Sequence, residues 1–170
     1  MQTKNRKAHC LETCLSIKKE VIEVDFDATG AYGGIINGDF LKPGDRADEN
    51  IKRHLAKNPD FQPTYGKYER RTIKMQCLPL TSIIKALGNP TIDYFSLDIE
   101  GAEFPVLQTI DFTQLDIKVI SLEISKLDLI FDARYVQLKY LMKRNGFELY
   151  KEMDEDHIYV RKDFIKKDEL

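Results

Sequence analysis

A regular alternation of apolar strands and short helices after Tyr68 is the feature that most constrains the fold of this chain. Runs with period-two or nearly continuous hydrophobicity alternate with segments of helical spacing, and the chain closes on a pair of strands. This order is typical of an α/β domain with parallel central strands. We therefore predict an α/β sheet that ends in an antiparallel hairpin.

The expected elements follow from hydrophobic spacing and from glycines and prolines that end helices. They are a strand at 73–77, a helix at 82–87, a strand at 92–97, a helix at 104–110, a strand at 117–124, a helix at 135–142 and a hairpin of 147–150 with 158–160. Upstream, strands at 21–26 and 35–36 flank the glycine-rich turn 30–34 and predict another hairpin.

Domain boundaries can be placed from composition. Residues 1–164 are expected to form one domain, and 165–170 a charged tail. Within the domain, 39–68 is polar and rich in proline and glycine, which indicates a surface excursion with room for one short helix at 45–57.

The charge balance excludes two classes of partner. The 170 residues carry 26 Lys and Arg against 28 Asp and Glu, for a net charge of −2. No single-signed patch that would bind nucleic acid or an anionic membrane is indicated. No apolar run approaches the ~18 residues that a membrane span needs, and no secretory signal is recognisable at the N-terminus.

The cysteines and histidines predict no site by their spacing. Cys10, Cys14 and Cys77 are too few and too scattered for a disulfide framework or a zinc site, so all three are expected to be buried hydrophobic residues. Of the histidines, we expect two to be exposed and the third to form a surface ion pair with neighbouring aspartates; these are His9, His54 and His157.

An acidic turn after the strand at 92–97 carries most of the chemistry. Ligands of parallel sheets lie beyond the carboxyl ends of the strands, which points to residues 98–103 and 123–126. Asp98 at the end of a buried strand is expected to be desolvated, and so to need a ligand, a cation or a proton as its partner. Glu100 and Glu103 have a second interpretation, as acidic residues in the first turn of a helix.

Residues 91–103, TIDYFSLDIEGAE, followed by Val106 and Leu107, resemble the hallmark segment of the FkbM family of S-adenosylmethionine-dependent methyltransferases. The preceding segment 77–84 resembles the strand and helix that lead into it. Residues 5–8 and 14–16 resemble the arthropod branch of that family that includes Star-like proteins. The resemblance extends from about residue 5 to about residue 164.

The resemblance implies a class I, Rossmann-like methyltransferase sheet, with S-adenosylmethionine as cofactor and an oxygen atom as methyl acceptor. Asp98 would lie where the cofactor and substrate sites meet and would contact both, with Glu100 as its catalytic neighbour. Methyl transfer needs alignment of the reactants and at most one base, a role that carboxylates can fill.

The chain departs from the family pattern in its first half. A glycine-rich turn after a first strand and an acidic residue after a second should precede the matched region, and residues 30–38 open no helix and are no substitute. We therefore expect the C-terminal part of a methyltransferase sheet, incomplete at its N-terminus. The strand at 92–97 would have an open edge, and this chain alone would be inactive and bind no cofactor.

A second hypothesis is a non-catalytic, Star-like regulator of growth-factor-receptor ligand trafficking. Its partner would be a secretory cargo protein, in place of an unknown methyl acceptor. The last four residues, Lys167, Asp168, Glu169 and Leu170, match the retrieval signal of the endoplasmic reticulum. They indicate the secretory pathway, or the cytoplasm if no upstream signal or anchor exists.

Overall fold

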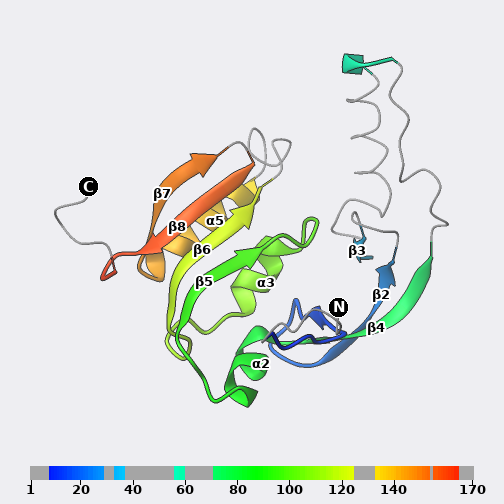
Figure 1. Ribbon diagram of the computed structural model, residues 1–170, viewed down its shortest axis with the longest axis horizontal. Coiled ribbons are helices and arrows are strands. Elements are labelled where there is room, and N and C mark those ends of the chain that lie inside the picture. The colour runs from blue at the N-terminus through cyan, green and yellow to red at the C-terminus, as the bar shows by residue number, and fades with distance from the viewer. Residues whose placement is uncertain are drawn as a thin grey trace.

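The computed structural model describes residues 8–28, 33–36, 56–59, 71–124, 133–153 and 155–164. Within these ranges the chain forms two four-stranded sheets and three helices, an α/β architecture (Figure 1). The expected surface excursion at 39–68, its helix at 45–57 and the tail at 165–170 lie outside the described residues, apart from 56–59.

The first sheet is built mainly from pairing between segments far apart in the sequence. Its strands follow the order β1-β4-β2-β3 and span Cys14–Leu15 (β1), Ile22–Asp27 (β2), Gly34–Ile35 (β3) and Thr72–Leu78 (β4). β2 pairs antiparallel with β3, which confirms the predicted hairpin, and β1 pairs parallel with β4. Residues of β4 alternate between exposed and less exposed, as the period-two pattern predicts.

The second sheet holds the C-terminal half. Its order is β5-β6-β8-β7, with strands Ile92–Leu97 (β5), Ile117–Glu123 (β6), Phe147–Met153 (β7) and Asp156–Arg161 (β8). β5 and β6 are parallel, and β8 and β7 form an antiparallel hairpin, as predicted. As also expected, β5 is an edge of this sheet within the described part of the chain.

One expectation about the sheet was wrong. The strand predicted at 73–77 was expected in the same sheet as β5 and β6, but β4 belongs to the first sheet. It makes six antiparallel pairs with β2, from Ile22 opposite Cys77 to Asp27 opposite Thr72. This ladder satisfies the backbone N–H and C=O groups on the edge of β4 that faces β2. Because β4 lies between β1 and β2, it does not pair with β5.

The three helices end where the sequence predicts. They are α2 (Leu80–Ala86), α3 (Glu103–Thr109) and α5 (Ala133–Arg144). Gly88 after α2 and Gly146 after α5 have φ angles of 87° and 83°. These left-handed conformations suit glycine and stop a helix.

The main core lies between the second sheet and these helices. Leu97, Ile120 and Leu122 are at most 2% exposed and share one face of the sheet, since Leu97 pairs with Leu122 and side chains alternate along β6. Residues of α2, α3 and α5 pack into the same hydrophobic cluster, and α3 and α5 are seen behind the strands in Figure 1. All three described helices therefore cover the same face.

His157 is part of this core, so the predicted surface ion pair was wrong. It pairs with Leu122 and is 2% exposed, because alternation along β8 turns it toward the helices. Its Nδ1 lies 3.5 Å from the Tyr135 hydroxyl and 3.8 Å from Glu152 Oε1. Burial lowers the pKa of His157. His9 is exposed as predicted, and His54 is outside the described residues.

The expectation that all three cysteines are buried and unbonded is correct only for the burial of Cys77. Cys14 and Cys77 form a disulfide across 63 residues, with Cα atoms 4.3 Å apart, and Cys10 is exposed with a free thiol. The two bonded residues face each other in the parallel register of β1 and β4. A two-residue strand pairing with a strand so distant in sequence leaves no periodic signal, which is why spacing alone missed it.

No helix in the described ranges is both long enough and apolar enough to cross a membrane.

The disulfide is expected to provide a large share of the stability of the first sheet. Closing a loop of 63 residues restricts the unfolded chain by about 4 kcal/mol in the chain-entropy description. Replacing both bonded cysteines, as Cys14→Ala with Cys77→Ala, should lower the free energy of unfolding by about that amount. Urea denaturation followed by circular dichroism measures it.

Cys10→Ser is the matched control and should leave the urea midpoint unchanged, because the Cys10 thiol is exposed and unbonded. A double variant as stable as the oxidised parent would show that the disulfide is not a stabilising link.

Candidate functional site

The acidic turn between β5 and α3 is held in an unusual backbone conformation. Glu100 and Gly101 follow each other with φ angles of 56° and 102°. A non-glycine residue in this region costs roughly 1 to 3 kcal/mol unless its surroundings hold it. Glu103 Oε1 supplies the hold, since it accepts hydrogen bonds from the amides of Ile99 at 2.8 Å and Gly101 at 3.2 Å. For Glu103 the helix-start interpretation is confirmed, because it is also the first residue of α3.

Parallel pairing brings three carboxylates together at the carboxyl edge of the second sheet. Leu97 of β5 faces Leu122 of β6, so the residues that follow on each strand are neighbours. Carboxylate oxygens of Asp98, Glu100 and Glu123 lie within 4.8 Å of one another.

The sequence pointed to both strand ends but did not name Glu123 as a site residue. The available signal was the same as for Asp98, a carboxylate at the end of a neighbouring apolar strand.

A shared proton relieves the repulsion in this cluster. The hydrogen bond with Asp98 raises the pKa of Glu123 to about 8, aided by burial and by the charges of Asp98, Glu100 and Glu103. Near neutral pH Glu123 therefore keeps its proton and donates it to an Asp98 oxygen. Three carboxylate oxygens at this spacing are also the ligands that hard divalent cations prefer.

Asp98 was expected to be desolvated, and this was wrong. The expectation that it has a partner is confirmed, since it forms a hydrogen bond with Glu123. Asp98 is exposed, because it lies on the face of the sheet opposite the described helices, whereas Glu123 beside it is half-buried. The proton on Glu123 is the partner that Asp98 finds.

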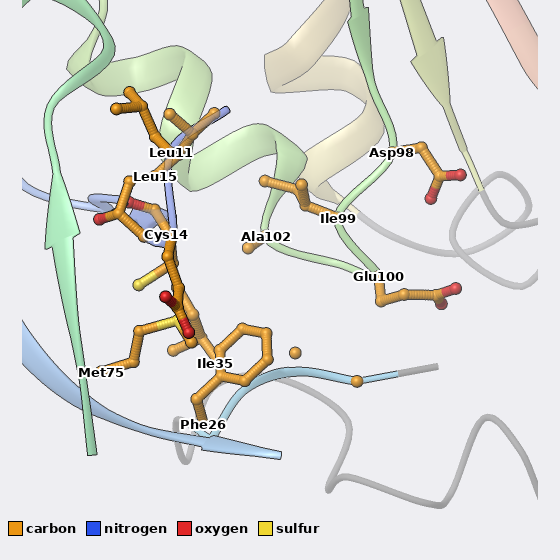
Figure 2. A pocket seen from close by; sticks show the side chains of 14 residues that line it. Leu11, Cys14, Leu15, Phe26, Ile35, Met75, Asp98, Ile99, Glu100 and Ala102 are labelled. Atoms are coloured by element: carbon orange, nitrogen blue, oxygen red, sulfur yellow. The ribbon is translucent and has the colours of Figure 1, made fainter. Parts of the chain in front are cut away.

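A pocket of about 460 Å³ lies between the first sheet and the acidic turn. One wall is the segment from Leu11 to Leu15, and the opposite side includes Asp98, Glu100 and Ala102. In Figure 2 the carboxylates of Asp98 and Glu100 point to the same side, away from the wall that carries Cys14. The acidic cluster thus borders an otherwise largely apolar pocket, a common form of ligand site.

The described end of the glycine-rich turn is also part of this pocket, which the sequence did not predict. Gly33 and Gly34 line the pocket, and the element that they enter is the strand β3 and not a helix, so they do not form a nucleotide-type loop. A Cβ atom on Gly34 would lie 3.8 Å from the Cβ of Glu100. The hairpin therefore packs directly against the acidic turn.

Glu123 is expected to make stability fall as the pH rises. Its folded pKa of about 8 exceeds the ordinary 4.5, so the folded state holds a proton that the unfolded chain releases between these values. Glu123→Gln keeps a donor toward Asp98 but cannot ionise. The variant should show a flatter loss of stability between about pH 5 and about pH 9 in urea denaturation.

NMR titration of the side-chain carboxyl gives a second readout. The Glu123 midpoint should lie near 8 in the parent and fall in Asp98→Asn, because Asp98 is the largest cause of the shift. Glu20→Gln, which removes an exposed carboxyl elsewhere, should change neither result. A parent midpoint near the ordinary value of 4.5 would contradict the shared proton.

Comparison with known proteins identifies the family. The family model described as methyltransferase FkbM domain matches residues 5–149, which is most of the chain. No curated protein and no solved structure matches the sequence. The matched region contains the first sheet with its disulfide, the acidic turn, and β5, β6 and the first residues of β7 in the second sheet. The last strand, β8, follows the matched region. The chain belongs to the FkbM methyltransferase domain family.

Proposed function

We propose that this domain serves methyl transfer from S-adenosylmethionine to an oxygen acceptor, with Asp98 and Glu100 as its site residues. The observation that carries the proposal is the cluster of Asp98, Glu100 and Glu123 at the carboxyl edge of two parallel strands, beside a pocket of about 460 Å³. Membership of the FkbM family supports it.

The chemistry required of the protein is modest, and the cluster can supply it. Asp98 is exposed at the pocket and accepts a hydrogen bond, so it can take the proton from an acceptor hydroxyl as that oxygen becomes a nucleophile. Glu123, still protonated, limits the charge repulsion that Asp98 feels from its neighbours. Glu100 is placed by the turn to orient the acceptor.

The described residues fit the cofactor only in part. S-adenosylmethionine carries the reactive methyl group on a positively charged sulfur, and carboxylates with apolar walls suit a cation with an aromatic ring. A backbone cradle is not available at the acidic turn, because the amides of Ile99 and Gly101 already donate to Glu103. We therefore assign no step to a bound cofactor and propose that this chain alone holds it weakly.

Two measurements on the oxidised full chain test this proposal. Calorimetry with S-adenosylmethionine at micromolar concentration should give no saturable heat. NMR at millimolar concentration should shift the amide signals of Ile99 and Gly101, and Asp98→Asn should remove the shifts. Asp93→Asn is the matched control and should retain the shifts, since Asp93 is an exposed carboxylate on β5, the strand that Asp98 follows.

The two readouts separate the two parts of the proposal. Saturable micromolar heat would show that the cofactor site is complete in this chain. If millimolar S-adenosylmethionine leaves the turn amides unmoved, the methyltransferase assignment of Asp98 and Glu100 is wrong.

We also propose a second candidate, a Star-like role in the secretory pathway without catalysis. The Cys14–Cys77 disulfide favours it, because disulfides form and persist in the oxidising compartments of that pathway. The residues from Lys167 to Leu170 agree with retention in the endoplasmic reticulum. The partner would be a secretory cargo protein such as a growth-factor precursor.

Expression in cells behind a cleavable signal peptide tests the second candidate. The chain should stay inside the cell, carry an oxidised Cys14–Cys77 pair and co-precipitate a membrane-bound growth-factor precursor. Leu170→Ala should release it to the medium, whereas Asp98→Asn should leave cargo binding intact. Equal secretion of the parent and Leu170→Ala, or loss of cargo with Asp98→Asn, would contradict this role.

A further inference from the structure

The two sulfur atoms of the disulfide differ in their access to solvent. Cys77 is 0% exposed and forms a small core with Ile35 and Ala102. Cys14 is half-buried and lines the pocket (Figure 2), whereas Cys77 does not line it. A molecule that enters the pocket therefore meets Cys14 first.

Apart from the disulfide, the strand that carries Cys14 is attached by pairing with β4, by two nearby hydrogen bonds and by packing of Leu15 against the main core. β1 is two residues long, lies at the edge of the first sheet and pairs with β4. Around it, the Thr13 hydroxyl donates to the Gln76 carbonyl at 2.6 Å, and the Ser16 amide donates to the Leu78 carbonyl at 2.8 Å. The disulfide is the covalent part of this attachment, so breaking it should loosen the whole wall.

The described lining of the pocket is largely apolar but carries three acidic residues, of which Asp98 and Glu100 point away from the wall that carries Cys14 (Figure 2). It includes the carboxylates of Glu12, Asp98 and Glu100, and the described lining residues include no lysine or arginine. Glu12 stands two positions before Cys14 on the same wall. Such a lining attracts small cations and repels anions.

We propose that Cys14 is a thiol-exchange site for small cationic aminothiols that enter through the pocket. The thiolate of the aminothiol attacks Cys14 Sγ, and a new bond joins the two sulfur atoms. The bond to Cys77 breaks, and its electron pair leaves on Cys77 Sγ, which takes a proton from water. The incoming sulfur is oxidised and Cys77 is reduced, so the step balances without another reagent.

The exchange changes the pocket. Ile99 and Ala102 of the acidic turn pack in the cluster of Cys77. Their packing therefore depends on the part of the first sheet that the disulfide holds together. Once Cys14 carries the aminothiol, only hydrogen bonds and packing join β1 to β4, and the wall that carries Cys14 can open more easily. The inference does not depend on methyl transfer, and its failure would leave the proposed function untouched.

Reaction rates with three thiols of different charge test the site, using Cys10→Ser as the background to remove the free thiol. The thiols are cysteamine, 2-mercaptoethanol and 3-mercaptopropionate, compared at equal thiolate concentration. Alkylation and peptide mapping after short exposure should find the adduct on Cys14 and the alkyl group on Cys77. Cysteamine should react roughly tenfold faster than 3-mercaptopropionate, and added salt should reduce the ratio.

Two tryptophan variants test entry through the pocket. Leu11 lines the pocket and is 59% exposed, so Leu11→Trp should narrow the entrance and slow exchange. Leu87 is 47% exposed at the end of α2, outside the described lining, so Leu87→Trp should leave the rate unchanged. Adducts on Cys77, equal rates for the three thiols, or equal rates for the two variants would overturn the proposal.

Hydrogen exchange reports the release of β1. In the cysteamine adduct the Ser16 amide, bonded to Leu78, should exchange faster than in the oxidised chain. The Ala28 amide, bonded to Arg71 at 2.8 Å at the far end of the same sheet, should not change. Unchanged protection of Ser16 would show that the disulfide does not hold the wall.

Discussion

The parallel pairing of β5 with β6 is the constraint on which the candidate site depends. It sets Leu97 opposite Leu122, so both strands end at the same level and release their carboxylates side by side. The same pairing buries both leucines under the helices. A one-residue slip would turn these leucines outward and separate Asp98 from Glu123, which is why the apolar core fixes the geometry of the polar site.

The acidic turn stands between the two sheets and is supported from both. On one side Glu103 holds the turn amides and begins α3, whose residues pack into the main core. On the other side Ile99 and Ala102 pack with Cys77 and Ile35 of the first sheet. The strained backbone at Glu100 therefore lies where two packed units meet, which is where a costly conformation can be maintained.

Most elements could be predicted because their signals are local. The strands at 92–97 and 117–124, the helix ends at Gly88 and Gly146 and the two hairpins follow from spacing and turn residues within short windows. The wrong expectations for the cysteines and for His157 involve partners far along the chain or the face of a strand on which a residue lies. His157 stands beside acidic residues, yet alternation along β8 turns it into the core.

By itself the sequence determined the kinds of elements, their order and the presence of an acidic turn after an apolar strand. These depend on hydrophobic period, glycine conformation and turn chemistry, which act between near neighbours. The tertiary structure alone decided which carboxylate keeps a proton, that Asp98 is exposed, and that Cys14 and Cys77 are bonded. Those properties depend on distances between residues that only the packing of sheets and helices brings together, and charge, burial and bond formation all depend on such distances.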